Sequence, residues 1–486
     1  RQRQMCIRDR DIYEGETFGL VGESGCGKST LGRTILQLYH QTYGRTMYYG
    51  RSLDDLAPKY VIDTVKNLKA RRTKLRELEQ KRDKLEADYA KLSEKEQYAK
   101  HGELDTARKL AEDALLDITK IVGGFLVVDD LDPVIAAYSK DYAIARKLSG
   151  MEEKRQELQV DVDDAEYAKK TAEEAGKSGK DGQLQKAQEK LKQCDDQIAA
   201  LRAQLDAGRK EIEALRAPYA NDPEFQKYEA YRDDGIDLAR LEYNEMRRLR
   251  RDMQLIFQDP YSSLNPRMSV GQIISEGMQA HNMIKKKDAR MQEMVLKIMD
   301  DCGLAPYFLH RFPHQFSGGQ RQRIGIARAL ATKPKFVVCD EAVSALDVSI
   351  QAQIINLLLD LKEQQNLTYM FITHDLSVVK YISDRVGVMY LGTMVELAAA
   401  DEIFHHPIHP YTEALLNAIP TTDTVGAKEL SILEGDIPSP VNPPKGCKFH
   451  TRCKYCTEIC TQVVPEWEEV RPNHFVACHH KLEAKE

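Results

Sequence analysis

The chain has 486 residues, of which 42% are hydrophobic and 30% are charged, a composition typical of a globular protein with roughly two or three domains. Its formal net charge of −6 at pH 7 gives no general attraction to nucleic acid or to an anionic membrane. No apolar run approaches the ~18 residues that cross a bilayer, and residues 1–10 contain no apolar core of a signal peptide, so we expect a cytosolic protein.

A phosphate-binding pattern, G-x-x-x-x-G-K-[ST], begins at Gly22. It follows the apolar run 17–21 and precedes a helix-like run, 31–38, which is the setting that such a loop requires. We expect its glycines to adopt positive φ angles that turn backbone N–H groups toward one point at the positive end of a helix. Lys28 would then reach the phosphates of a nucleoside triphosphate, and Ser29 would bind Mg²⁺. The residues predicted to contact the nucleotide are Gly22, Glu23, Ser24, Gly25, Cys26, Gly27, Lys28, Ser29 and Thr30. Alone, the pattern leaves kinase, GTPase and ATPase open.

Few residues precede this loop. ATPases that recognise adenine usually have antiparallel strands ahead of it, but the first ten residues here are polar and without period. We therefore expect those strands to be missing, with the native start of the protein upstream. From Asp11 to Gly50 the sequence predicts a strand, the loop, a helix and a short strand at 46–49.

The composition changes between Pro58 and Pro218, where Lys, Glu, Ala, Leu, Gln and Asp dominate. A first heptad seam consists of Val61, Leu68, Leu75, Arg82 and Tyr89, with Leu78, Leu85 and Leu92. A second consists of Leu184, Leu191, Ile198, Leu205 and Ile212, with Ala187, Cys194, Leu201 and Leu215. Their similar length predicts that the two seams pair as an antiparallel coiled-coil hairpin, each arm reaching roughly 50 Å. The alternative is a solvated, partly disordered linker.

Further motifs follow in the region 219–400. Gln258 comes directly after an apolar strand, where its amide oxygen could reach a metal. The segment 316–320 opens a helical run and forms a second nest of phosphate size. One apolar strand ends in the carboxylates Asp340 and Glu341, and another ends at His374. Carboxylates, a metal and a histidine beside a phosphate chain are sufficient for phosphoryl transfer to water.

In this order, the motifs resemble those of ABC-type ATPases, which are α/β P-loop proteins. Under that resemblance, 22–30 is the Walker A loop, 316–320 is the signature and 344–347 is the D-loop. The resemblance assigns catalytic roles to Glu341, His374 and Gln258, with ATP and Mg²⁺ as cofactors. It assigns Mg²⁺ binding to Ser29, Gln258 and Asp340, and further nucleotide contacts to Ser317, Gly318, Gly319, Gln320 and Asp347.

Three stretches, 257–268, 345–353 and 409–416, resemble ATP-binding subunits of oligopeptide and dipeptide importers, specifically the F-type member of the pair. This implies a second ATPase subunit in a heterodimer, two transmembrane permease subunits and, indirectly, an extracytoplasmic peptide-binding protein. It places the chain on the cytoplasmic face of the plasma membrane, with no nucleic-acid partner. Two departures are Ala342, where the family usually has proline, and the helical insert.

A second function class is a non-transport ABC ATPase that uses its coiled coil for structural or DNA tethering. In such ATPases the coil divides the Walker A lobe from the signature lobe and is much longer. Here the insert precedes Gln258, and an importer-type tail follows. The sequence therefore favours the importer. We expect four regions, with bounds 1–57, 58–218, 219–400 and 401–486: the start of the nucleotide-binding domain, the inserted coiled coil, the remainder of that domain and the importer-type C-terminal region.

Cysteines gather in that last region. In a reducing compartment, the group formed by Cys447, Cys453, Cys456, Cys460 and Cys478 favours a metal site over disulfides. In similar importer subunits, the positions of Cys447, Cys453, Cys460 and Cys478 ligate a [4Fe–4S] cluster, which is what the resemblance implies here. Zn²⁺, for which the short step from Cys453 to Cys456 is typical, and a metal-free group of thiols are the alternatives.

Overall fold

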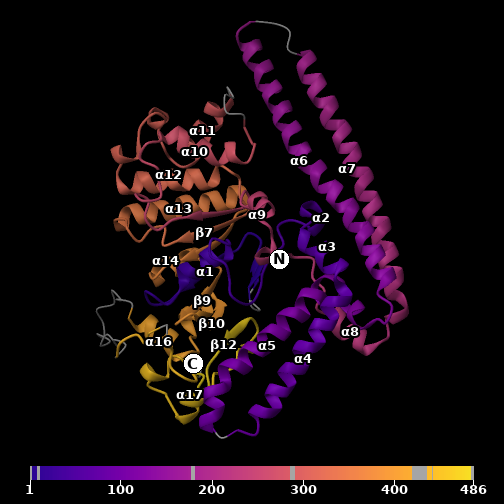
Figure 1. Ribbon diagram of the computed structural model, residues 1–486. Coiled ribbons are helices and arrows are strands. Elements are labelled where there is room, and N and C mark those ends of the chain that lie inside the picture. Colours follow the sequence, from indigo (N-terminus) through magenta and orange to yellow (C-terminus); the bar gives the residue numbers. More distant parts are fainter. Residues whose placement is uncertain are drawn as a thin grey trace.

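The computed structural model describes residues 3–7, 11–92, 94–176, 181–284, 290–418, 435–439 and 442–482. It has an α/β fold with a long helical hairpin along one side, which confirms the predicted fold class (Figure 1). Among the helices in these ranges, none is both long and apolar enough to cross a bilayer. Within the predicted C-terminal region, 419–434 lies outside the described residues.

The core is an eight-stranded sheet with the strand order β11-β12-β10-β9-β3-β8-β7-β6. The strands are β3 (Thr17–Val21), β6 (Met253–Ile256), β7 (Phe336–Asp340), β8 (Thr368–Ile372), β9 (Arg385–Tyr390), β10 (Thr393–Ala399), β11 (Glu468–Arg471) and β12 (His474–Val476). Those from β9 to β6 run parallel, and the others add an antiparallel edge. β3, β7 and β8 are buried along their whole length, as expected of parallel strands covered on both faces.

The register brings the carboxyl ends of these parallel strands to one level. Ile372 at the end of β8 lies opposite Leu20 of β3 on one side and Asp340 of β7 on the other. On the next strand pair, Ile256 of β6 lies opposite Cys339 of β7. The segments that follow the strands, which carry the predicted phosphate loop and catalytic side chains, therefore emerge along the same edge of the sheet.

A second, four-stranded sheet has the order β2-β1-β4-β5 and is antiparallel. Its strands are β1 (Arg3–Ile7), β2 (Asp11–Tyr13), β4 (Thr46–Tyr48) and β5 (Ile236–Asp237). The expectation that the strands before the phosphate loop are missing was therefore wrong for β1 and β2. β1 pairs with β2 on one side and, across the phosphate loop and helix that separate them in the sequence, with β4 on the other, which a search for local apolar periodicity does not detect. Ile12, Tyr48 and Ile236 join the core cluster of β3 and β6.

Helices complete the nucleotide-binding fold. They are α1 (Lys28–Ile35), α9 (Tyr243–Leu249), α10 (Val270–Ala280), α11 (Arg290–Asp301), α12 (Gly318–Leu330), α13 (Val348–Gln365), α14 (Leu376–Ile382), α15 (Ala400–His405), α16 (Pro410–Asn417) and α17 (Glu458–Gln462). Ser269 and Ser317 begin α10 and α12 as capping boxes, each exchanging hydrogen bonds with a glutamine three residues later. α10 to α13 form a helical lobe with a common core that includes Ile274, Val295 and Ile326.

The helical insert forms two hairpins instead of one. α4 (Leu68–Tyr89) packs along α5 (Glu94–Val122), and α6 (Asp132–Glu174) packs along α7 (Asp181–Arg216). The prediction that the two heptad seams pair with each other was wrong, because each seam has a helical partner next to it in the sequence. A short chain connection favours pairing with the neighbour, since closing a longer loop costs more entropy.

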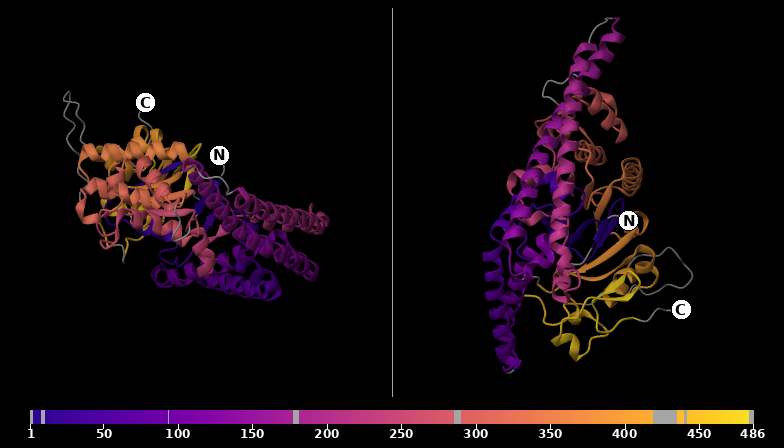
Figure 2. Two further views of the ribbon diagram at one scale, coloured as in Figure 1. Left: turned by 90° about the horizontal axis from the view of Figure 1, so that it is seen from above. Right: turned by 90° about the vertical axis from the view of Figure 1, so that its right-hand side faces the viewer.

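The hairpins point in opposite directions from a shared base near α8 (Pro223–Glu229), as both Figure 1 and Figure 2 show. The short helices α2 (Leu53–Leu56) and α3 (Lys59–Lys66) lead into them. On α7 the predicted seam is the buried side, with Cys194, Ile198, Leu205 and Ile212 inside, which confirms its heptad pattern.

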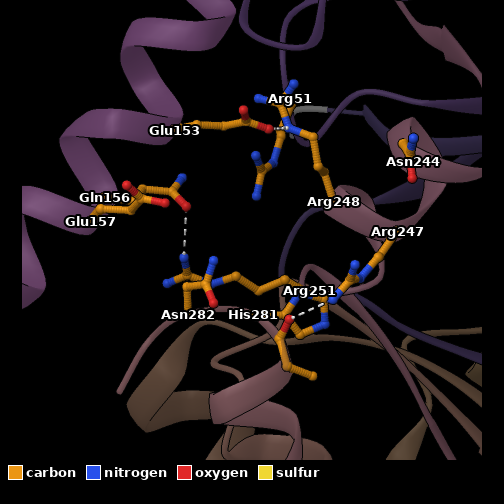
Figure 3. A pocket seen from close by; sticks show the side chains of 11 residues that line it. Arg51, Glu153, Gln156, Glu157, Asn244, Arg247, Arg248, Arg251, His281 and Asn282 are labelled. Carbon is orange, nitrogen blue, oxygen red and sulfur yellow. Dashed lines mark hydrogen bonds and ion pairs between the residues drawn. The ribbon is translucent and has the colours of Figure 1, made fainter. Parts of the chain in front are cut away.

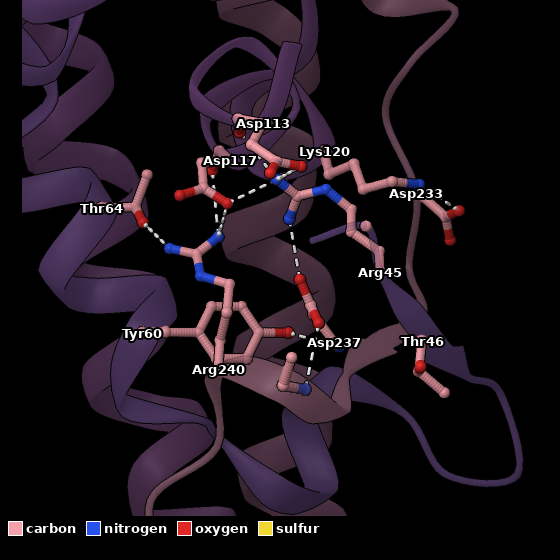
Figure 4. Close-up of polar contacts among 12 residues, drawn as sticks. Arg45, Thr46, Tyr60, Thr64, Asp113, Asp117, Lys120, Asp233, Asp237 and Arg240 are labelled. Carbon is pink, nitrogen blue, oxygen red and sulfur yellow. Dashed lines mark hydrogen bonds and ion pairs between the residues drawn. The ribbon is translucent and has the colours of Figure 1, made fainter. Parts of the chain in front are cut away.

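A network of charged side chains joins the insert to the core (Figure 4). Arg45, just before β4, contacts Asp117 of α5 at 2.6 Å and Asp237 of β5 at 2.7 Å, and its side chain is only 10% exposed. Arg240 contacts the same Asp117 at 3.2 Å and donates to the hydroxyl of Thr64 on α3. Since these charges are largely buried, their pairing fixes where α3 and α5 leave the core.

Candidate functional site

The predicted phosphate loop joins β3 to α1 as a continuous turn. Gly22, Gly25 and Gly27 have φ angles of 153°, 78° and 100°, which confirms the positive φ values predicted for them. A side chain on Gly22 would collide with the carbonyl oxygen of Met389 on β9, so the close approach of two backbones adds a second reason for glycine. The loop therefore presents backbone N–H groups at the positive end of α1, the arrangement that binds phosphate.

Lys28 lies inside this loop. Its Nζ donates to the carbonyl oxygens of Gly22 at 2.7 Å and Glu23 at 3.0 Å, and the residue is only 4% exposed. Beside it, burial raises the pKa of the Cys26 thiol in spite of the nearby ammonium of Lys28, so the thiol remains protonated near neutral pH. The ammonium is thus the fixed positive charge of the loop.

Ser29 and Asp340 meet across the sheet edge, although 311 positions separate them in the sequence. The Ser29 hydroxyl donates to Oδ1 of Asp340 at 2.6 Å, and Asp340 is fully buried. A hydroxyl and a carboxylate held together are the oxygen ligands that Mg²⁺ prefers, and Mg²⁺ keeps several waters in such sites. These two residues fit the predicted metal position.

Arg33 was missed by the sequence analysis. Its Nη2 lies 3.3 Å from Oδ2 of Asp340, the oxygen that Ser29 leaves free. The residue stands four positions after Ser29 on α1, so both side chains project from one face of the helix. That spacing is the sequence feature that could have identified it.

Gln258, Glu341 and His374 converge at the ends of three parallel strands. The Gln258 amide donates to Oε2 of Glu341 at 2.5 Å, and Nδ1 of His374 lies 3.4 Å from Oε1 of the same carboxylate. Glu341 has a φ of 47°, in the left-handed region that non-glycine residues seldom adopt. Its backbone N–H donates to the carbonyl of Ile372 on β8, which holds it in this conformation. The carboxylate is therefore aimed from a fixed backbone toward the space beyond the strand ends.

The signature segment lies on the helical lobe and not at this edge (Figure 1). Ser317 caps α12, where its hydroxyl accepts from the backbone N–H of Gln320, while Gly318 and Gly319 lie close to Leu346 and Ile350. Asp347 precedes α13 as its N-terminal capping residue. The predicted signature and D-loop residues are thus next to one another on α12 and α13.

The C-terminal region contacts the phosphate loop directly, which the sequence did not indicate. Arg452 makes a two-pronged ion pair with Glu23, at 2.7 Å and 3.1 Å, and its side chain is 4% exposed. The hydroxyl of Tyr411 accepts from the backbone N–H of Glu23 at 2.9 Å. Glu23 and Arg452 are 429 positions apart, so no local pattern connects them. Together these contacts brace the loop from the side of the cysteine-rich segment.

The cysteines of that segment are free thiols, with Cys460 and Cys478 buried. Burial and the neighbouring thiols raise the pKa of Cys447 to about 11 and that of Cys478 to about 12. The backbone N–H of Cys447 donates to the carbonyl of Cys460 at 2.8 Å. Yet the described residues, which include all four predicted ligands, contain no group of three or more His, Cys, Asp or Glu arranged to hold a metal ion. The thiols are neighbours, but their arrangement does not fit a preformed metal site.

Comparisons with known proteins give two family matches. The model of the ABC transporter family matches residues 9–226 and 226–344, and the model described as the oligopeptide/dipeptide transporter C-terminal region matches residues 395–460.

Curated relatives match at high identity. The oligopeptide transport ATP-binding protein AppF of Bacillus subtilis (strain 168) is 52% identical over 250 residues, covering 50% of this chain and 75% of that protein. A putative peptide import ATP-binding protein of Brucella abortus (strain 2308) is 54% identical over 245 residues, covering 50% and 77%. Among solved structures, cbiO1 from Clostridium perfringens is 28% identical with a TM-score of 0.31, covering 34% of this chain and 64% of that one.

Proposed function

This chain belongs to the ABC transporter family and is an ATP-binding subunit that energises peptide import, and on that premise we propose how its residues bind and hydrolyse ATP. The loop amides and Lys28 hold the phosphate chain of ATP. Ser29 and Asp340 hold Mg²⁺, joined by the amide oxygen of Gln258. Bound Mg²⁺ supplies charge neutralisation at the phosphates. Of the two function classes considered from the sequence, an importer ATPase and a tethering ATPase, the family matches select the importer.

Glu341 is the residue that we propose polarises the attacking water, with His374 beside the terminal phosphate. The observation that carries this proposal is the convergence of Gln258 and His374 on the Glu341 carboxylate at 2.5 Å and 3.4 Å. These two side-chain contacts hold the Glu341 carboxylate in one orientation, which suits it to act as a general base. The residues Ser317, Gly318, Gly319, Gln320 and Asp347 would complete the site of a second ATPase subunit.

The test is Glu341→Gln in the assembled transporter. A glutamine keeps the shape of the side chain but accepts no proton, so we expect turnover to fall by ~10²–10³-fold, with ATP still bound in a closed dimer. Glu363→Gln, an exposed change on α13, is the matched control. Turnover unaltered by Glu341→Gln would remove Glu341 from this role.

As a member of its family, the chain works with permease and binding-protein subunits of a peptide ABC transporter. We propose more narrowly that it is the F-type member of a heterodimeric ATPase pair on the cytoplasmic face of the membrane, beneath two permeases. Exposed Tyr261, three residues after Gln258, belongs to the surface that we assign to the permease contact. Purification of the native complex should recover a second ATPase subunit, different in sequence from this chain, together with permease subunits. Recovery of this chain from native membranes as a homodimer free of permease would contradict the assignment.

We propose that residues 58–218 are an inserted domain and that 1–57 and 219–400 together form the nucleotide-binding domain, followed by 401–486. The Arg45 network joins α5 of the insert to β5 of the core, and Arg240 joins α3 to the same network, which supports this division. Replacing Pro58–Pro218 with a short Gly/Ser linker should preserve ATP binding while lowering stability, because Arg45 loses Asp117. Loss of ATP binding in a variant that still folds would make the insert part of the nucleotide site.

The cysteines of the C-terminal region are the basis of a separate proposal about a metal cluster. We propose that Cys447, Cys453, Cys460 and Cys478 take up a [4Fe–4S] cluster, with Zn²⁺ as the alternative. The proximity of these cysteines supports the proposal, since the backbone N–H of Cys447 donates to the carbonyl of Cys460 and the side chains of Cys447 and Cys453 pack against one hydrophobic cluster. The absence of a preformed metal group among the described residues stands against it. Iron, sulfide and zinc analysis of anaerobically purified protein separates the outcomes. Protein without any of the three would leave a structural group of thiols.

A further inference from the structure

A polar pocket lies between the insert and the nucleotide-binding core. Its volume is ≈ 320 Å³, and α6, α9 and the end of α10 form its walls. Arg51, Arg247, Arg248 and Arg251 line it, together with His281 (Figure 3). The lining also includes Glu153, Gln156, Glu157, Asn244, Ala280 and Asn282.

The pocket is separate from the nucleotide site. Arg251 stands just before β6, at the amino end of that strand, whereas Gln258 follows its carboxyl end. Parallel strands place their amino ends at one edge of a sheet and their carboxyl ends at the other. The arginines and the phosphate loop therefore occupy opposite edges of the central sheet.

Two of the four arginines already have carboxylate partners. Arg51 forms a double contact with Asp252, and Nε of Arg248 lies 2.7 Å from Oε1 of Glu153. Arg248 also donates to the hydroxyl of Ser149 on α6 at 2.8 Å. These pairs fix the positions of two guanidinium groups in the wall.

Arg247 and Arg251 are different, because their hydrogen-bond partners are neutral. Arg247 donates to the carbonyl of Ala280, and Arg251 donates to the amide oxygen of Gln156, both at 3.3 Å. No carboxylate among the described residues lies within ion-pair distance of either guanidinium. Since a guanidinium carries five N–H donors, most of the donors of these two remain available to a ligand.

The electrostatic environment agrees with an anion as that ligand. Burial lowers the pKa of Arg251, and burial together with the charges of Arg251 and Arg247 lowers the pKa of His281. Arg251 and His281 thus lie in a partly desolvated place beside the exposed Arg247, and a bound anion would relieve the repulsion between these positive groups.

The basic surface continues beyond this pocket. An adjoining pocket of ≈ 330 Å³ shares Arg51, Gln156, Arg248 and Arg251 with it. That pocket adds Arg202, Lys333 and Lys335, against the acidic residues Asp55, Glu152 and Asp252. Over the linings of the two pockets together, seven Arg and Lys side chains therefore stand against five Asp and Glu side chains.

We propose that the pocket binds a phosphate-bearing anion, with Arg247 and Arg251 as its principal donors. Guanidinium groups bind phosphate through paired N–H···O hydrogen bonds. A volume near the lower end of the ~300–1,000 Å³ range of ligand pockets suits a small ligand such as a diphosphate. Because α6 supplies one wall and the core supplies the others, an occupied pocket ties the insert to the nucleotide-binding fold.

Pyrophosphate binding to the full chain tests the proposal. Lys28→Ala is present throughout, so that binding of the probe at the phosphate loop is weakened, and calorimetry at low salt measures the dissociation constant. We expect a saturable site that weakens at least tenfold in Arg247→Gln/Arg251→Gln. Glu157→Gln should tighten it, and Arg76→Gln, which removes an exposed arginine of α4, should leave it unchanged. Circular dichroism checks folding, and Arg251→Gln alone replaces the double variant if that one unfolds.

A second arm distinguishes a soluble phosphate from one carried by a lipid. Sedimentation with phosphatidylcholine vesicles that contain phosphatidic acid reports the lipid headgroup, using the same variants. Binding of either probe that is lost with Arg247 and Arg251 supports the proposal, and the stronger probe identifies the source. Absence of saturable binding to both probes, or binding that is equal in the double variant, would overturn it.

Discussion

The nucleotide site and the helical insert are stabilised in opposite ways. The site depends on single short contacts between distant residues, such as the 2.6 Å hydrogen bond from Ser29 to Asp340 across 311 positions. The insert depends on a repeated seam, in which α7 packs on its sequence neighbour α6 through many similar side chains. Removing one side chain should therefore affect the site strongly and most of the insert weakly.

The largest expected effect lies where the insert joins the core of the nucleotide-binding fold, and there a single side chain also matters to the insert. Arg45→Ala removes the cation that pairs with Asp237 and one of the two arginines that pair with Asp117 in a largely buried network, so we expect the free energy of unfolding to fall by ~3–5 kcal/mol. Urea denaturation measures the change in the free energy of unfolding, and Arg76→Ala, at an exposed position of α4, is the control. A loss below ~1 kcal/mol would mean that the network is a solvated one.

Within the nucleotide site, Lys28→Ala should weaken ATP binding about a hundredfold, equivalent to ~2.7 kcal/mol. The buried ammonium is the fixed charge of the loop, and no other cation of the loop replaces it. Equilibrium binding of a fluorescent ATP analogue provides the measurement, with the exposed Lys297→Ala as control. An affinity within threefold of the parent protein would show that the backbone amides are sufficient.

Arg452→Gln tests how much a contact from the C-terminal region contributes to the nucleotide site. Without the ion pair to Glu23 the loop is less fixed, and we expect ATP affinity to fall about fivefold, or ~1 kcal/mol. Lys454→Gln is a matched control, since Lys454 pairs with Glu413 instead of the loop. Equal effects of both changes would point to a general loosening of the segment.

The smallest effect is expected inside the insert, at Asp141 of α6. Burial and the nearby charge of Asp54 raise the pKa of Asp141 from 3.8 to about 6, and its Oδ1 has no hydrogen-bond partner. The folded state thus binds the proton more tightly than the unfolded state, and stability falls as the pH rises from about 3.8 to 6. Asp141→Asn should raise the melting temperature by a few degrees at pH 7.5 and leave it unchanged near pH 3.5. The exposed Asp206→Asn should do neither.

Much of the site was predictable because its residues follow strands whose order the motifs preserve. The positive φ angles of Gly22 and Gly25, the position of Asp340 at the end of β7 and that of His374 two residues beyond the end of β8 follow from local composition. The helix that pairs with each heptad seam could not be predicted in this way, because a seam specifies a buried face and not the helix that covers it. Strands β1 and β2 and the Glu23–Arg452 pair depend on contacts between remote segments, for which one sequence offers no local pattern.

α6 also touches both parts of the nucleotide-binding fold. Asp163 and Asp164 lie near Arg290 of the helical lobe at 2.8 Å and 3.3 Å, while Ser149 and Glu153 contact Arg248 beside the sheet. The helix ends at Glu174, which is 21 residues beyond Glu153, or about 30 Å at ~1.5 Å per residue. A rotation of the lobe by a few degrees about the contact at Glu153 would therefore displace this end of the helix by about 2 Å. Fluorophores on that end and on the core would report any such rotation as a change of distance.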